Sequence, residues 1–218
     1  MSAIGIIGGV GPLAGVDLAR KIIEHTNAGC DQEHINMYLI SCPSLIPDRT
    51  TYLLNGGEDP APGIQICMNK LADMGATAVG ICCNTAHSPR ILERVSVPEG
   101  VKFINMIESV PREGKVGLLA TMGTIQCGIY KNVVIPCEDT CKKVHETIYN
   151  IKSGNIQRQP LIDAIEELQC DSVILGCTEL PLAFEGVREV NGTKLIDPTE
   201  ILAIELIKAT APEKLKLN

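Results

Sequence analysis

Two cysteines follow apolar runs and precede turns that contain threonine. Cys83 lies in GICCNTAH at 80–87, and Cys177 lies in LGCTELP at 175–181. Each should stand where a buried strand ends and a helix begins, and the backbone N–H groups of a helix start favour anions. We therefore expect both thiols to lose their protons more readily than an ordinary cysteine with a pKa of about 8.5. Two such groups on opposite faces of a substrate could invert a carbon atom by removing one proton and delivering another.

A cysteine is more often a small buried hydrophobic residue than a reagent. The chain has 10 cysteines in 218 residues. Cys82 continues the apolar run before Cys83, so we assign it to the core. The length and the absence of a basic leader before the first apolar run predict reduced thiols and a cytoplasmic protein.

Apolar runs and helical periodicity alternate along the chain. We expect strands at 4–7, 35–40, 78–81, 101–104, 115–120, 133–135, 172–175 and 195–196. We expect helices at 13–24, 63–74, 85–94, 124–131, 138–151, 159–168 and 198–209, and a Pro/Gly-rich loop at 41–60 that the segment TTYLLN at 50–55 interrupts. Strands that are apolar on both faces are typical of a mostly parallel sheet covered by helices.

The second half of the chain repeats the order of the first. IGIIGGVGP at 4–12 resembles VGLLATMGT at 116–124, and the two cysteine turns correspond. Chance similarity among glycine-rich turns is the alternative, but the matched cysteines favour duplication. We expect two pseudo-symmetric, doubly wound α/β domains, residues 1–105 joined by a C-terminal helix at 198–218, and residues 106–197. Ligands bind beyond the carboxyl ends of such strands, which predicts an active site in the cleft between the domains.

Composition excludes some classes of partner. The formal net charge is −7, aromatic residues make up 3% of the chain, and tryptophan is absent. These values disfavour nucleic acid and acidic membranes as partners. No apolar run approaches the roughly 18 residues of a membrane span.

Five segments resemble the aspartate/glutamate racemase family, and most of all its aspartate racemase branch. They are IGIIGGVGP at 4–12, PDRT at 47–50, CNTAH at 83–87, GLLAT at 117–121 and GCTELP at 176–181. The resemblance implies an isomerase that needs no pyridoxal phosphate, other cofactor or metal, with Cys83 and Cys177 as catalytic residues. It also implies a small dicarboxylic amino-acid substrate and a homodimer.

The resemblance implies further site residues. The arginine of the family's PDR motif falls on Arg49, which could hold a carboxylate bidentately. A family lysine falls on Lys152 of IKSG. Asparagine and threonine side chains near the thiols could hold a second carboxylate and stabilise the transition state. The expected substrate-binding residues are Val10, Gly11, Arg49, Asn84, Thr85, Thr121, Thr124, Lys152, Thr178 and Glu179.

Other functions stay open at this point. The glutamate racemase branch typically has an acidic residue and serine in the first turn, where this chain has GGVGP, and histidine in place of Glu179. Glutamate racemase, maleate isomerase and a malonate-type decarboxylase are alternatives within the same superfamily. A non-catalytic protein that binds small anions and has inert thiols is an alternative of another class.

For three further features, a structural role is a better interpretation than a functional one. G-x-G-x-x-A at 9–14 fits a dinucleotide fingerprint, but the acidic residue expected at the end of the second strand is missing. Cys137, Cys141 and His145 recur at helical spacing and could bind a metal, yet a packed stripe explains them. We interpret His87 as a packed, hydrogen-bonded histidine and not as a catalytic base.

Overall fold

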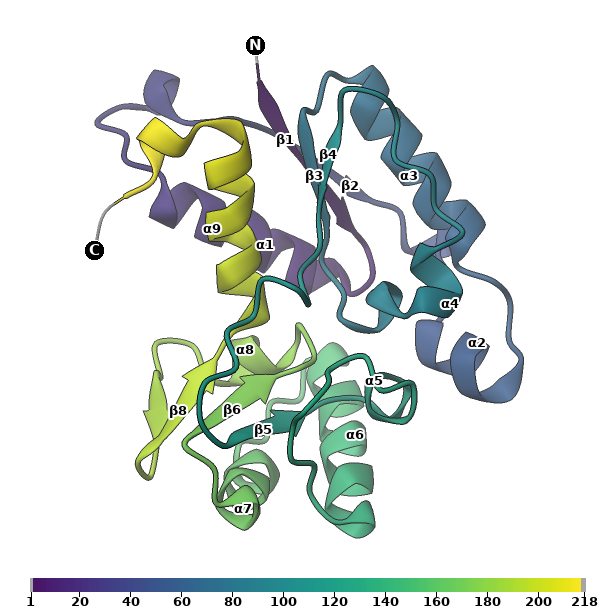
Figure 1. The fold of residues 1–218 in the computed structure, drawn as a ribbon, viewed down its shortest axis with the longest axis vertical. Helices are drawn as coiled ribbons and strands as arrows, with labels where there is room; N and C mark the ends of the chain where they lie inside the picture. The colour runs from purple at the N-terminus through teal and green to yellow at the C-terminus, as the bar shows by residue number, and fades with distance from the viewer. Residues whose placement is uncertain (1, 217–218) are drawn as a thin grey trace.

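The computed structural model of the protein describes residues 2–216. Residue 1 of the first expected domain and residues 217–218 of the expected C-terminal helix lie outside this range. The first sheet is parallel throughout and has the order β2-β1-β3-β4 (Figure 1). Its strands are β1 (Ala3–Gly8), β2 (Asn36–Ser41), β3 (Ala78–Ile81) and β4 (Lys102–Ile104). Every residue of β1 and β3 is buried, as their uniformly apolar sequences require.

Helices cover both faces of the first sheet. Ile6 of β1 shares a core cluster with Leu18 and Leu202, whereas its neighbour Ile7 shares another cluster with Ile64. The last helix therefore packs beside the first one, although the two are far apart in the sequence (Figure 1). This contact is the one expected of a C-terminal helix that joins the first domain, while the domain boundaries stay a prediction. The helices are α1 (Pro12–His25), α3 (Ala61–Asp73) and α9 (Pro198–Thr210).

The second sheet has the order β5-β6-β8-β7, in which only β7 is antiparallel. Its elements are β5 (Val116–Leu119), β6 (Ser172–Leu175), β7 (Glu189–Val190), β8 (Thr193–Ile196), α6 (Glu138–Lys152) and α7 (Gln159–Leu168). Leu119 and Val173 pack against α6 and α7. Leu118 and Ile174 point to the other face and join the cluster that contains Ile6. The two halves therefore share one core cluster, and each half also has a cluster of its own.

The second sheet repeats the topology of the first. Val134 forms one parallel bridge with Gly117 of β5 and takes the place that β2 has beside β1. The order Val134-β5-β6-β8 then matches β2-β1-β3-β4. Cys83 follows β3 and Cys177 follows β6, so the two thiols occupy equivalent turns. The expected fold, two domains with mostly parallel sheets and alternating helices, is confirmed.

One expected strand does not form, and one segment without an assigned structure is helical. The run at 133–135 forms a single bridge and not a strand, because Asn132 has a positive φ of 56° on one side and Pro136 follows on the other. The segment TTYLLN, which interrupts the expected loop at 41–60, belongs to α2 (Arg49–Asn55). Asp48 caps α2 by accepting the N–H of Thr51 at 2.7 Å, and a left-handed glycine ends the helix.

Two expected helices are shorter than their sequence pattern. The segment 85–94 divides into a 3-10 turn, Thr85–His87, and α4 (Pro89–Leu92), because proline cannot donate a backbone hydrogen bond within a continuous helix. The segment 124–131 holds only the end of α5 (Met122–Gln126), and Gly128 with a φ of 56° follows it. After Cys177, α8 (Leu180–Ala183) is a single turn.

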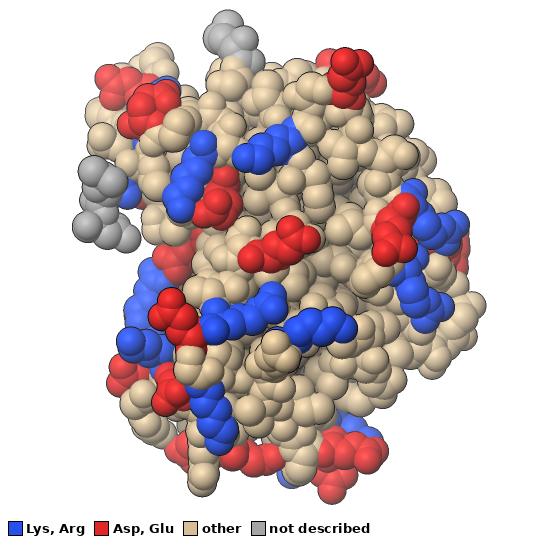
Figure 2. Space-filling model, in the orientation of Figure 1, with Lys and Arg blue, Asp and Glu red and all other residues tan. Residues whose placement is uncertain are grey.

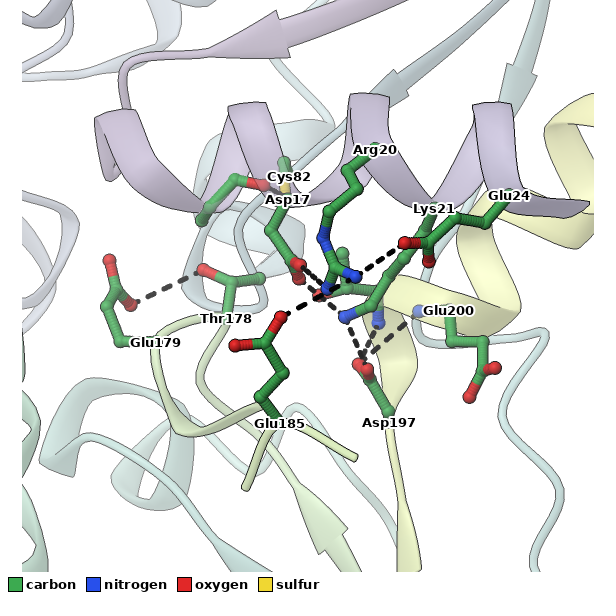
Figure 3. Close-up of polar contacts among 12 residues, drawn as sticks. Asp17, Arg20, Lys21, Glu24, Cys82, Thr178, Glu179, Glu185, Asp197 and Glu200 are labelled. Carbon is green, nitrogen blue, oxygen red and sulfur yellow. Dashed lines mark hydrogen bonds and ion pairs between the residues drawn. The ribbon is translucent and has the colours of Figure 1, made fainter. Parts of the chain in front are cut away.

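Charged side chains join the halves where the chain returns from β8 to α9. Lys21 of α1 is buried and donates to Asp17 at 2.5 Å and to Asp197 at 2.6 Å (Figure 3). Asp197 also caps α9 through the N–H groups of Thr199 and Glu200.

On the face drawn in Figure 2, acidic and basic side chains alternate and form no extended basic surface. Among residues 2–216, no helix has the length and apolarity that crossing a membrane requires.

Candidate active site

A small pocket with an empty volume of about 280 Å³ lies where the turns after β1, β3, β5 and β6 meet. Both halves of the chain therefore contribute to it, as the strand-end rule for parallel sheets predicts. All the site residues expected from the sequence line it except Gly11 and Thr124. The lining residues are Val10, Asp48, Arg49, Thr50, Cys83, Asn84, Thr85, Thr121, Lys152, Cys177, Thr178 and Glu179.

The two exceptions lie next to the pocket. Gly11 lines an adjoining hollow together with Arg49 and Lys152. A side chain at Gly11 would displace the carboxylate of Glu179. Thr124 is fully buried behind the lining, where its hydroxyl lies 2.9 Å from that of Thr85.

The two thiols differ in their hydrogen bonding. Cys83 and Cys177 are 5% and 7% exposed, and Cys177 Sγ donates to Glu179 Oε2 at 3.0 Å. Burial raises the pKa of the Cys177 thiol well above its ordinary value, and the negative charge of Glu179 raises it further. The expectation that Cys177 loses its proton readily is therefore wrong. The single turn of α8 has only a small dipole, so burial and the neighbouring carboxylate dominate.

Arg49 places a buried positive charge in the pocket. Its Nη2 donates to the carbonyl of Val10 at 2.9 Å and its Nη1 to that of Pro47 at 3.3 Å. Its Nε is buried and has no partner among the described residues. Burial lowers the pKa of Arg49, but interaction with Cys83 and the carboxylates of Asp48 and Glu179 raises it more. The guanidinium stays charged and keeps N–H groups for a ligand.

Lys152 supplies a second cation from the other half of the chain. It is the last residue of α6, and its Nζ lies 4.6 Å from the ring centroid of Tyr149. Desolvation lowers the pKa of Lys152, but its electrostatic interactions with Cys177 and Glu179 raise it more. The pocket thus holds one cation from each half, which suits a ligand with two negative groups.

Asp48 and Thr50 also line the pocket, and sequence reasoning did not include them. Both flank Arg49 in the PDRT segment, and this adjacency could have predicted that they line the pocket. Burial raises the pKa of Asp48, but the N–H of Thr51 and the charges of Arg49 and Lys152 lower it more. Asp48 is therefore an anion in a pocket that also holds cations.

Neutral donors and acceptors complete the lining. The hydroxyl of Thr85 lies 3.2 Å from that of Thr121, which connects the two halves. Tyr130 donates its hydroxyl to Asn84 Oδ1 at 2.6 Å, while Asn84 Nδ2 is buried and has no partner within residues 2–216. Tyr130 belongs to no motif of the sequence, and only the packing of the halves places it beside Asn84.

The interpretation of His87 as a packed residue is confirmed. Its Nδ1 lies 2.8 Å from the carbonyl of Cys83, and its Nε2 accepts the N–H of Met106 at 3.3 Å. Burial lowers the pKa of His87 to about 4, so the ring stays neutral, and both of its nitrogens have backbone partners. Cys82 is fully buried and donates to the carbonyl of Ala14 at 3.1 Å, which confirms its place in the core.

Two residues of the possible metal site at Cys137, Cys141 and His145 form hydrogen bonds to the backbone. His145 Nδ1 accepts the N–H of Met122 at 3.3 Å, and Cys141 Sγ donates to the carbonyl of Pro136 at 3.3 Å. Across residues 2–216, no group of three His, Cys, Asp or Glu side chains is arranged to hold a metal ion.

The fold and the pocket define a class of protein: two α/β halves that each bring one thiol and one cation to a shared site. A family model described as Asp/Glu/Hydantoin racemase matches residues 7–206. The chain belongs to this family. Its named members below are racemases, which are isomerases.

Individual relatives agree with this assignment. The structure of Picrophilus torridus aspartate racemase matches with a TM-score of 0.85 at 30% identity, covering 100% of this chain and 96% of that one. The glutamate racemase of Erwinia tasmaniensis is 31% identical over 64% of this chain and 58% of its own length. The match thus spans less than two thirds of that curated relative. Francisella tularensis glutamate racemase, solved with D-glutamate, shares the fold with a TM-score of 0.64 at 18% identity and 84% coverage of that chain.

Proposed function

We propose that the protein is an amino-acid racemase that acts on aspartate and inverts its α-carbon by proton transfer between Cys83 and Cys177. One observation carries the proposal: two buried thiols on equivalent turns of the two halves line the same pocket. A two-base inversion needs an acid and a base on opposite sides of one carbon atom. Because the thiols supply both, the proposal requires no cofactor.

The proposed mechanism requires one thiolate and one protonated thiol at the start of the reaction. In one direction the Cys83 thiolate removes the α-proton, and the electron pair is left on the α-carbon. Cys177, protonated because its pKa is raised by burial and Glu179, gives its proton to the opposite face. Cys83 then ends as the thiol and Cys177 as the thiolate, so the reverse reaction starts from the product state.

The charges of the pocket complement aspartate. Its two carboxylates would meet Arg49 and Lys152, and the free Nδ2 of Asn84 adds a donor. Its ammonium group would lie near the carboxylate of Asp48. Fixed donors near the α-carboxylate also stabilise the negative charge that develops when the α-proton leaves.

One comparison favours aspartate over glutamate as the substrate. The structure of the aspartate racemase of Picrophilus torridus matches with a TM-score of 0.85, against 0.64 for the glutamate racemase of Francisella tularensis. The second candidate function is glutamate racemisation, which the sequence similarity to glutamate racemases supports. A cytoplasmic homodimer remains part of the proposal on the strength of the family resemblance.

Proton NMR tests this proposal directly. The purified protein is incubated in D₂O with L-aspartate or L-glutamate, without added cofactor. We expect the α-proton signal of aspartate to disappear while D-aspartate accumulates, and glutamate to react more slowly. Faster reaction of glutamate would support the second candidate. If neither amino acid exchanges its α-proton, the racemase proposal fails. The alternative function, non-catalytic binding of a small anion, would then be favoured.

A further inference from the structure

We propose that Tyr130 is a positioning residue, which fixes the amide of Asn84 so that its Nδ2 points at a substrate carboxylate. Tyr130 donates its hydroxyl to Asn84 Oδ1 at 2.6 Å. That bond leaves Nδ2 as the free end of the amide, and Nδ2 is buried without a partner among the described residues. The inference deepens the proposed function and rests on it for the identity of the substrate.

The orientation of an amide decides whether it attracts or repels an anion. Asn84 is 2% exposed and lines the pocket beside Cys83, so its free end faces the ligand and not the solvent. A half-turn of the amide would present the oxygen of Asn84 to a carboxylate held by Arg49 and Lys152. Two oxygens would then face each other without a hydrogen between them, which is costly in a buried site.

Tyr130 is suited to prevent that half-turn. Its side chain is 4% exposed, and burial raises the pKa of its hydroxyl, so the hydroxyl keeps a proton to donate. The guanidinium of Arg112 lies over the ring, 5.7 Å from its centroid, and donates to the carbonyl of Ile107 at 2.9 Å. Tyr130 thus holds Asn84 without touching the substrate.

The bond also connects the two halves of the molecule. Asn84 belongs to the turn after β3 and Tyr130 to the segment after α5. The amide next to Cys83 is therefore set by the half that supplies Cys177. A correct Asn84 orientation requires the halves to be docked, which links substrate binding to their relative position.

The test removes only the hydroxyl, in Tyr130→Phe, and measures two independent quantities. Kinetics with aspartate should show KM raised about tenfold with kcat changed little, because a misplaced donor weakens substrate and transition state alike. Calorimetry with L-aspartate and succinate should show the dissociation constant raised by a similar factor. Tyr38→Phe deletes a hydroxyl outside the pocket and should change neither quantity.

A double-substitution cycle separates positioning from general damage. In an Asn84→Ala background, Tyr130→Phe should cause no further loss of affinity, since the amide that it orients is gone. Equal losses in both backgrounds, or unchanged affinity of Tyr130→Phe, would overturn the inference. Because succinate binding is measured without turnover, a protein that binds succinate in this Asn84-dependent way but does not racemise aspartate would refute the proposed function alone.

Discussion

At the scale of single residues, the two thiols occupy equivalent turns but meet different charges. Cys177 donates to Glu179, whose carboxylate opposes the thiolate, and Lys152 partly offsets this effect. Cys83 interacts instead with the guanidinium of Arg49. The two equivalent turns therefore have different electrostatic surroundings.

The role of Glu179 can be tested through the titration of Cys177. In Glu179→Gln, the pKa of the Cys177 thiol should fall, because the substitution removes a negative charge that disfavours the thiolate. Burial, the larger cause, remains. Alkylation by iodoacetamide across a range of pH, resolved for each cysteine by peptide mass spectrometry, measures this shift.

Glu185→Gln is the matched control, since Glu185 is an exposed glutamate nearby in the sequence. Its Cys177 profile should coincide with that of the wild type. If the profile of Glu179→Gln also stayed at the wild-type position, the carboxylate would not be a cause of the raised pKa.

The sequence predicted the residues that carry local motifs and missed those that depend on packing. Cys83, Cys177, Arg49 and Lys152 all line the pocket, as expected. The raised pKa of Cys177 was not foreseen, because it depends on burial and on the carboxylate of a side chain that local motifs do not orient. Tyr130 was missed for a related reason, since it meets Asn84 only when the two halves dock.

At the scale of elements, the segment that brings Arg49 into the pocket is held by helix α3. The 3-10 turn Pro43–Leu45 and the following residues lead directly to the start of α2. Gly63 of α3 lies against this turn so closely that a Cβ there would overlap the carbonyl oxygen of Leu45. The position of Arg49 therefore depends on a glycine in a neighbouring helix.

Gly63→Ala tests this dependence. The added methyl group must displace the backbone of the turn, and overpacking of this kind costs about 1–3 kcal/mol of unfolding free energy. Urea unfolding measures the loss, and the rate of aspartate racemisation should fall as well because Arg49 moves. Lys70→Ala, on an exposed position of the same helix, should have little effect on either quantity. A Gly63→Ala protein as stable and active as the Lys70→Ala protein would contradict the account.

Elements were predictable from the sequence where periodicity and length agreed. The strand and helix patterns of the first sheet were clear because β1 and β3 are uniformly buried. Helix α2 was missed because TTYLLN is a short segment within a Pro/Gly-rich region, although Asp48 and Gly56 bound it as a cap and a left-handed stop. The run at 133–135 lacked the length for more than one bridge.

At the scale of the whole molecule, the two halves form one site and share one of their core clusters. They meet in the cluster that contains Ile6 and Leu118, in the threonine contact between Thr85 and Thr121, and in the bond between Asn84 and Tyr130. The buried charges around Lys21 link α1 to the chain where it returns from the second sheet (Figure 3). Cys83 and Cys177 face the same pocket only because these contacts dock the halves.

The central claim is that both thiols, one from each half, transfer protons to and from the same carbon atom. The most direct measurement is α-proton exchange and racemisation of L- and D-aspartate in D₂O by Cys83→Ala and Cys177→Ala, with Cys82→Ala as the adjacent buried control. We predict that each pocket substitution lowers racemisation in both directions at least a hundredfold, the scale of a lost acid or base, while Cys82→Ala stays active. Racemisation at the wild-type rate by a folded Cys83→Ala or Cys177→Ala protein would contradict the account.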